Sequence, residues 1–266
     1  MNTTKILVLI SVLFLIFTSC EKVVDLNLDE APQALVIEAV LFDSIGDNYV
    51  IISKSKPFNE NIGSFETISG ASVVIVDNVG NSYVLNEVAD GIYNNLSLKG
   101  ITGRTYTLSV NVDGKSVTAQ STMQPRVNLD SLSHEKQDNP FSGADEPDSY
   151  RIFNHFYDTP NFSNYYRIKA YSRRVQQKGV LVLSDDLIDG DNVVFPNFQI
   201  EFEEGDTAIV QLLSIDEENF RYFHALSSSQ EGEVPGNPET NLEGENVVGY
   251  FGAYAKSQKS IVITPL

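Results

Sequence analysis

The segment from Asp185 to Asp191, which reads DDLIDGD, concentrates the side chains best suited to hold a metal ion. Calcium takes about six to eight oxygen ligands, and carboxylates gathered on a tight turn can supply several of them. Gly190 could provide the turn, but an EF-hand loop begun at Asp185 would place Leu187 at its third position and Pro196 at its twelfth. Two interpretations stay open: a solvated acidic loop, which we favour, and a calcium site of another type. The candidate ligands are Asp185, Asp186, Asp189 and Asp191.

A group of basic residues lies just before this acidic segment. No acidic residue occurs between Asp158 and Asp185, although the whole chain has 36 acidic and 18 basic residues and a net charge of −18. This local reversal of sign indicates either a docking patch for an acidic partner or ligand, or cross-strand pairing with Glu201 and Glu203. We favour the pairing. The basic residues are Arg167, Lys169, Arg173, Arg174 and Lys178.

Residues that could carry out catalysis are few. The sequence contains no G-x-S-x-G nucleophile motif and no glycine-rich phosphate loop. The three histidines, His134, His155 and His224, are far apart and lack the spacing of metal ligands. We therefore expect a protein that is not an enzyme and has no catalytic residues. Its acidic charge repels nucleic acid, so we expect no nucleic-acid partner.

Cys20 follows a stretch with the three-part plan of a secretory signal. Lys5 precedes an apolar run from Ile6 to Phe17, and the small polar residues Thr18 and Ser19 lead to the cysteine. As a helix the apolar run would rise about 18 Å, which is shorter than the hydrocarbon core of about 30 Å. We therefore do not expect this segment to span a membrane.

A cysteine at this place is typical of bacterial lipoproteins, in which it becomes the new N-terminus and carries the lipid. We predict that residues 1–19 are a lipoprotein signal peptide and that Cys20 is lipidated, so that the chain is anchored to a membrane. The alternative is a secretory signal with an incidental cysteine. Residues 20–33 are acidic and polar, which predicts a tether.

Short strands separated by turn residues are predicted over residues 34–125, which indicates a β-sandwich domain. Thr105–Val112 alternates apolar with polar residues, and Asp113 and Gly114 suit a type I′ hairpin turn. The expected register pairs Val112 with Lys115, Val110 with Val117, Leu108 with Ala119 and Ser109 with Thr118.

A second β-rich domain is predicted over residues 126–266, because the proline of Met123-Gln-Pro125 would interrupt a strand ladder. One helix is expected at about 215–229, with Ser214 and Glu217 as its capping box. Two strands, Val247–Ala255 and Ser260–Thr264, would end the chain. The expected fold is thus all-β: a sandwich, then a second sandwich or open barrel with one capping helix.

Several motifs carry a family resemblance. The stretches Ile68–Asp77, Gly80–Leu85 and Gly91–Tyr93 resemble transthyretin-like or carboxypeptidase-regulatory β-sandwiches. Together with further motifs the chain is similar to domain-of-unknown-function family 4249, which comprises lipoproteins of the Bacteroidota envelope. The further motifs are CEKVVD at 20–25, GRTY at 103–106, SDDLIDG at 184–190 and YFGAY at 250–254.

The resemblance implies an outer-membrane lipoprotein, on either the surface or the periplasmic face, in a family often encoded beside a TonB-dependent transporter. The expected function is a non-enzymatic accessory or binding subunit of such a transporter. The alternatives are a surface adhesin or matrix-type binding protein and, from another class, an envelope hydrolase.

Overall fold

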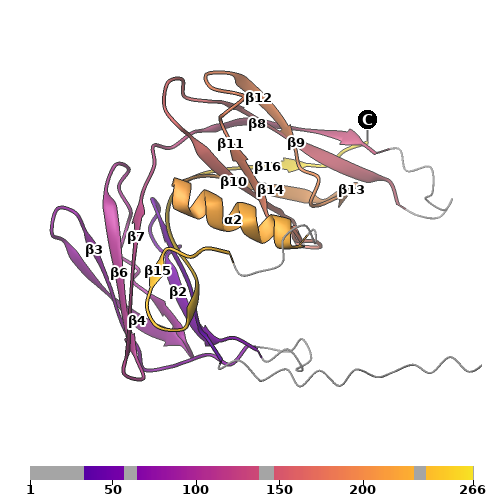
Figure 1. Ribbon diagram of the computed structural model, residues 1–266. Helices are drawn as coiled ribbons and strands as arrows, with labels where there is room; N and C mark the ends of the chain where they lie inside the picture. Colours follow the sequence, from indigo (N-terminus) through magenta and orange to yellow (C-terminus); the bar gives the residue numbers. More distant parts are fainter. Residues whose placement is uncertain (1–32, 57–64, 138–146, 231–237, 266) are drawn as a thin grey trace, which may run out of the picture. The chain divides into compact units, whose positions relative to one another are not determined.

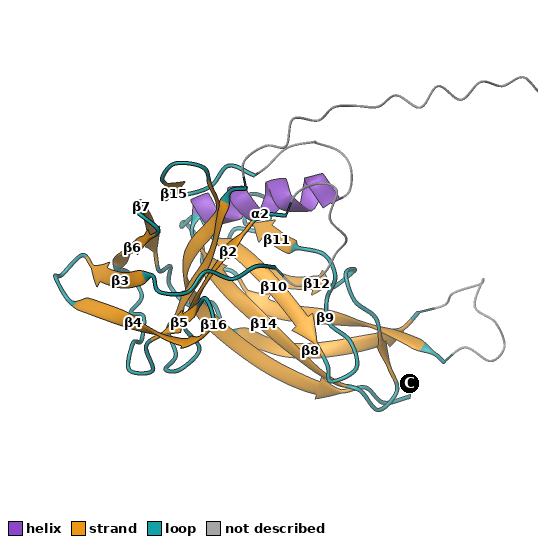
Figure 2. Cartoon of the chain, turned by 90° about the horizontal axis from the view of Figure 1, so that it is seen from below, coloured by secondary structure: helices purple, strands orange, loops and turns teal. Residues whose placement is uncertain are grey.

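Strands make up most of the computed structural model, which describes residues 33–56, 65–137, 147–230 and 238–265. The described residues contain one helix, α2 (Glu217–Gln230), drawn in purple among the strands of Figure 2. The expected all-β class is therefore confirmed. The predicted signal peptide, Cys20 and residues 20–32 of the tether lie outside the described residues. In the described ranges, no helix is both long and apolar enough to cross a bilayer.

A central run of strands has the order β11-β10-β14-β16-β1-β2-β5. Figure 1 labels these strands except β1 and β5. The longest member of the run, β16 (Val247–Val262), pairs in parallel with β1 (Leu35–Phe42) and antiparallel with β14 (Thr207–Ile215). The other strands of the run are β11 (Leu181–Ser184), β10 (Tyr165–Tyr171), β2 (Tyr49–Lys54) and β5 (Ile92–Asn94).

The first core lies between this central run and a second layer of strands. The second layer is joined to the run where β4 (Ser82–Ala89) pairs with β5. The β4–β5 register shifts between Glu87 and Ala89, and beyond β4 the strand order is β3-β6-β7-β15. Ile37 of β1 is fully buried in one cluster with Ile75 and Leu108, so the two layers pack face to face. The added strands are β3 (Ser72–Asp77), β6 (Thr105–Val112), β7 (Lys115–Thr122) and β15 (Leu242–Glu243).

The second core lies between β10, β14 and a four-stranded sheet around β9 (Ser149–Tyr157). Alternate residues of β10, namely Tyr166, Ile168 and Ala170, are buried in one cluster with Tyr150 and Phe156 of β9. The partners of β9 are β8 (Leu129–Lys136), β12 (Asn192–Pro196) and β13 (Phe202–Glu203).

The single strand β16 contributes to both cores. Phe251, Ala253 and Ala255 belong to the first core, and Ile261 packs against the second. Because successive side chains of a strand point to opposite faces, these odd-numbered residues share one face and both sandwiches lie on it. The expectation of two final strands is wrong, since β16 is one continuous strand from Val247 to Val262.

The predicted division near Pro125 coincides with a change of core, because Met123 belongs to the first cluster and Val127 to the second. The pairing of strands crosses that division, since β1 pairs with β16. Residues Gln33–Leu266 form one compact unit.

The β6–β7 hairpin is confirmed in the expected register, including the pairs of Leu108 with Ala119 and of Val110 with Val117. Asp113 and Gly114 have φ values of 50° and 75°, as a type I′ turn requires. This local prediction succeeds because the turn residues and the alternation both specify the same register.

Helix α2 begins two residues later than expected and has a different cap. Asp216 is the N-cap: its Oδ1 accepts a hydrogen bond of 3.0 Å from the Asn219 amide. The predicted capping box of Ser214 and Glu217 is wrong, because β14 extends to Ile215 and keeps Ser214 in the strand. There the Ser214 hydroxyl instead accepts a hydrogen bond from the Val127 amide.

Candidate functional site

Strand β10 places two of the predicted basic residues on one side of the central run of strands. Tyr166, Ile168 and Ala170 face the second core, so Arg167 and Lys169 face the opposite side, which also carries α2. Arg173 lies beyond the end of β10 and is exposed.

Beside α2 on this side lies a groove of about 490 Å³, which we name the cationic groove. Among the described residues, Arg167, Lys169, Lys178 and Lys256 line it, and Asp47 is the only acidic residue that does so. Apolar and polar surface is supplied by Phe42, Tyr49, Tyr171, Gln176, Gln177 and Gln211. The sequence did not indicate Lys256, because its position two strands from β10 depends on the pairing of β10 with β14 and of β14 with β16.

Arg167 is held firmly at this site. Its guanidinium carbon lies 3.7 Å from the centre of the Phe223 ring on α2, which is a cation–π contact. Burial raises the pKa of the nearby Tyr250 hydroxyl, and the positive charge of Arg167 opposes that rise. The Phe223 ring thus fixes the guanidinium against the middle of the helix.

Lys169 stands out because it has no acidic contact. Within the described part of the chain, its amino group makes no hydrogen bond and has no carboxylate oxygen within 4.0 Å. Burial lowers the pKa of Lys169, and the adjacent Arg167 lowers it further, whereas the charge of Glu38 opposes both effects. A half-buried cation beside another cation is costly unless an anion compensates it.

The other two groove cations differ in their surroundings. The Lys256 amino group donates a hydrogen bond of 2.5 Å to Asp47 and lies 4.7 Å from the centre of the Phe42 ring. Its hydrogen bond holds the pKa of Asp47 below the usual value. Lys178 is exposed at the rim.

The predicted cross-strand pairing with Glu201 and Glu203 is wrong, because β10 pairs with β11 and β14 and not with β13. Arg174 forms ion pairs of 2.8 Å with both Glu203 and Asp206. Glu201 forms no ion pair among the described residues, and the strand β13 contains only Phe202 and Glu203 and pairs with β9. The basic group thus divides into a paired Arg174, an exposed Arg173 and three residues at the groove.

The predicted calcium ligands are brought together only in part. Carboxylate oxygens of Asp185 and Asp189 lie within 4.8 Å of each other and of Asp158, which the sequence did not indicate. Asp186 and Asp191 are exposed and outside this group. Asp158 was missed because it follows β9, whose approach to residues 185–190 depends on the tertiary fold.

Each carboxylate of the group already accepts a hydrogen bond from the protein. The Tyr166 hydroxyl and the Gly190 amide donate to Asp158, the latter at 2.9 Å. The Asn164 and Asn161 amides donate at 2.7 Å to Asp185 and Asp189. The arrangement offers oxygen ligands of the kind calcium prefers, and it also satisfies itself without an ion.

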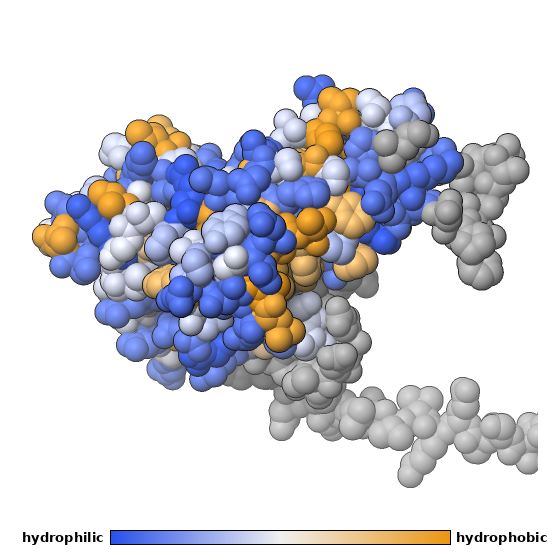
Figure 3. All heavy atoms as spheres, turned by 90° about the horizontal axis from the view of Figure 1, so that it is seen from above, coloured by the Kyte–Doolittle hydropathy of each residue, from blue (hydrophilic) through white to orange (hydrophobic). Residues whose placement is uncertain are grey.

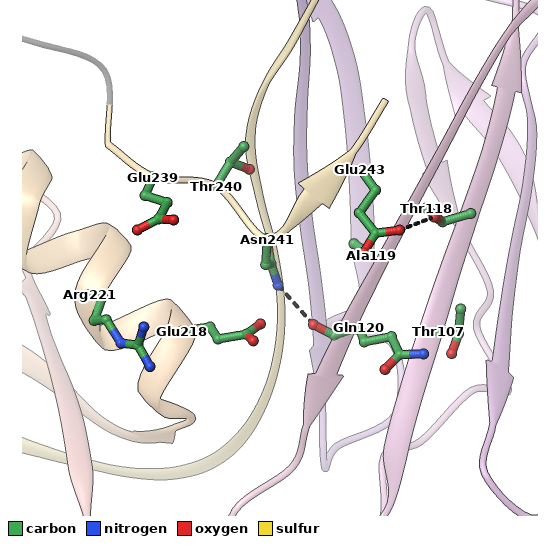
Figure 4. Close-up of a pocket in the computed structure, with 10 residues that line it drawn as sticks. All are labelled: Thr107, Thr118, Ala119, Gln120, Glu218, Arg221, Glu239, Thr240, Asn241 and Glu243. Atoms are coloured by element: carbon green, nitrogen blue, oxygen red, sulfur yellow. Dashed lines mark hydrogen bonds between the residues drawn. The ribbon is translucent and has the colours of Figure 1, made fainter. Parts of the chain in front are cut away.

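A polar pocket of about 390 Å³ lies between α2, β6, β7 and residues 239–243 (Figure 4). Its Asn241 amide donates a hydrogen bond of 2.9 Å to the Gln120 carbonyl. Burial raises the pKa of Glu218, and the negative charge of Asp216 adds to this effect. The pocket holds threonines but no cysteine, serine or histidine, so it lacks a nucleophile–histidine pair. Its charged lining residues are Glu218, Arg221, Glu239 and Glu243.

One serine–histidine pair occurs elsewhere. The Ser133 hydroxyl and His155 Nε2 are 2.7 Å apart across β8 and β9. In the described ranges no carboxylate lies within 4.0 Å of His155, so the orienting acid of a catalytic triad is absent there. His134 bonds to the Thr264 carbonyl and His224 lies beside Phe220, so the three histidines do not converge.

The face seen from above in Figure 3 is mainly hydrophilic, with separate hydrophobic patches. The exposed apolar residues of the structure include Leu187, Phe198 and Val194.

The chain matches a known protein family over most of its length. A family model described as "Domain of unknown function (DUF4249)" matches residues 21–260. No curated protein is significantly similar to the chain. Among solved structures, a segment of two fibronectin type III domains from chicken tenascin aligns with 10% identity and a TM-score of 0.23. That alignment covers 87% of this chain and 99% of the tenascin segment, but its TM-score is too low to support an argument.

Proposed function

This chain belongs to the DUF4249 family, and we propose that it is a non-enzymatic binding subunit anchored to the outer membrane through lipid on Cys20. In this proposal it serves as an accessory to a TonB-dependent transporter. The membrane attachment is supported by residues 1–20, in which an apolar run and small residues precede the only cysteine.

The cationic groove is the observation that carries the proposal. Four basic side chains line it against one acidic residue, on a chain with a net charge of −18. A site that gathers basic residues on a predominantly acidic chain supports recognition of an anionic group. The sites described above support binding better than catalysis, because the Ser133–His155 pair has no orienting acid among the described residues.

Gentle extraction of the full lipidated chain tests this function. The chain is isolated from membranes in mild detergent, and its partners are identified by mass spectrometry, with a Cys20→Ser variant as the control. We expect a large transporter barrel to accompany the wild-type chain and to be depleted with the control. Isolation of the wild-type chain without any transporter would contradict the proposal.

The same preparation separates the alternatives. A surface adhesin would bind glycan or matrix protein without a transporter. A hydrolase that used the Ser133–His155 pair would lose its activity in a Ser133→Ala variant.

A further inference from the structure

We propose that the cationic groove binds a linear acidic segment of a partner protein, lying extended along β10 with carboxylates at alternating positions. The inference rests on the proposed function, in which the chain is a binding subunit, and adds the chemistry of the partner.

The first argument is that one cation of the groove lacks a direct hydrogen bond or ion pair within the described part of the chain. Lys256 is paired with Asp47, but Lys169 has no hydrogen bond or ion pair among the described residues. The chain has twice as many acidic as basic residues, and none of the described acids forms an ion pair with this half-buried amino group. An anion from outside the chain would supply the missing partner.

The second argument is the spacing of the cations. Arg167 and Lys169 are two residues apart on one face of a strand, which is a separation of about 6.7 Å. Alternate side chains of an extended peptide repeat at the same distance, so two of its carboxylates can face these two cations.

The distribution of the cations across the sheet favours several carboxylates over one compact anion. Arg167 pairs with Leu213, which pairs with Lys256, so these two cations lie two strands apart. Two strand spacings amount to about 9.6 Å. Backbones this far apart favour contacts to several points along a ligand rather than to one phosphate or sulfate.

The third argument is that the cations beside Lys169 are already held in place by neighbouring side chains. The Phe223 ring contacts Arg167, and Asp47 and Phe42 flank Lys256. Binding therefore costs little side-chain ordering at those two positions. Lys169 retains its three donors for the ligand and is the residue to change.

Fluorescence anisotropy with the full chain in mild detergent tests the inference. The probe is a labelled peptide in which Glu alternates with Ser. The comparison peptides have Gln in place of Glu, or the same Glu residues in one contiguous block. Succinate and inorganic phosphate serve as small-anion competitors.

We expect Lys169→Glu to weaken binding of the alternating peptide by about tenfold or more, and Lys169→Arg to retain most of the affinity. Arg173→Glu and Lys259→Glu make the same charge change at exposed residues that do not line the groove, and should alter the affinity less than about twofold. Thermal melting of each variant establishes that it is folded.

Equal binding of the Glu and Gln peptides, or an unchanged affinity in Lys169→Glu, would overturn the inference. So would displacement of the peptide by succinate or phosphate at equal concentration, since that result identifies a small-anion site. If a transporter co-purifies equally with the wild-type and Lys169→Glu chains, the proposed function stands and this inference fails. Groove-dependent peptide binding without a transporter partner supports the inference and removes the transporter from the proposed function.

Discussion

Asp216 is the residue through which α2 is tied to the first core. Its Oδ2 accepts hydrogen bonds from the Ser121 hydroxyl at 2.6 Å and the Thr122 amide at 3.0 Å, both on β7. Its Oδ1 accepts from both the backbone and the side-chain amide of Asn219. One carboxylate therefore satisfies donors from two elements far apart in the sequence.

Replacing Asp216 with Ala should destabilise the protein strongly. The loss of an N-cap costs about 1 kcal/mol, and the buried donors left on β7 and α2 add about 1–3 kcal/mol. For a domain of this size we expect the melting temperature to fall by about 5–12 °C, as measured by circular dichroism.

Glu217→Gln is the matched control for this substitution. Glu217 is exposed at the same end of the helix and forms an i,i+4 ion pair with Arg221, which contributes about 0.3–0.5 kcal/mol. A similar loss of stability in both variants would show that Asp216 is not the connecting residue.

The calcium hypothesis leads to a second prediction at the same scale. If the carboxylates of Asp158, Asp185 and Asp189 hold calcium with a dissociation constant of about 10 µM, 1 mM calcium should raise the free energy of unfolding by about 2.7 kcal/mol. Asp189→Asn should abolish that increase, because it removes one carboxylate ligand. The fold should be kept, because Asp189 is exposed and an amide oxygen can still accept the hydrogen bond from Asn161.

Asp186→Asn and Asp191→Asn are the controls, since both residues lie outside the group and should keep the response. Identical melting temperatures in calcium and in chelator would leave the solvated acidic loop as the correct interpretation.

Single residues were predictable where a local pattern decided their place. The Asp185–Asp191 segment indicated Asp185 and Asp189 as neighbours, because both belong to one short acidic segment. Lys256 and Asp158 were not predictable in the same way. Their neighbours are set by strand pairing and loop approach, which the local sequence does not contain.

At the scale of elements, the parallel pair β1–β16 requires a close approach of two backbones. Gly249 has φ of +114°, and a Cβ on it would lie 2.0 Å from the Ile37 carbonyl oxygen on β1. Glycine is needed there both for its backbone conformation and for space.

Gly249→Ala should therefore weaken this pair far more than an ordinary glycine substitution. Gly103→Ala is the control: its φ is +81°, but a Cβ there meets nothing within 4 Å. The control isolates the backbone strain of about 1–2 kcal/mol, and we expect Gly249→Ala to cost more than this in denaturant titrations. Equal losses would show that the contact with β1 does not constrain the strand.

Elements were predictable to the extent that they were local. The β6–β7 hairpin was predicted in register, because its turn and its alternation act over neighbouring residues. The cap of α2 was misassigned because both Ser214 and Asp216 are N-cap residues by type, and only the length of β14 decides between them.

At the scale of the whole unit, the two cores should unfold together. Both depend on β16, so loss of either core removes support from the other. Leu108→Ala in the first core and Ile168→Ala in the second should each cost about 2–5 kcal/mol. Hydrogen exchange should show that each substitution lowers the protection of both cores. Protection lost only in the mutated core would show that residues 34–125 and 126–266 are independent domains.

The long reach of β16 also has a consequence for the order of events during synthesis. Leu35 obtains its parallel partner only when Val247 is present, so the first strand to leave a ribosome or a translocation channel waits for nearly the last. Contacts of such wide sequence separation form slowly, so the pairing of β1 with β16 comes late in folding. If the chain is exported as proposed above, this delay leaves the central sheet incomplete until the whole chain has crossed the membrane.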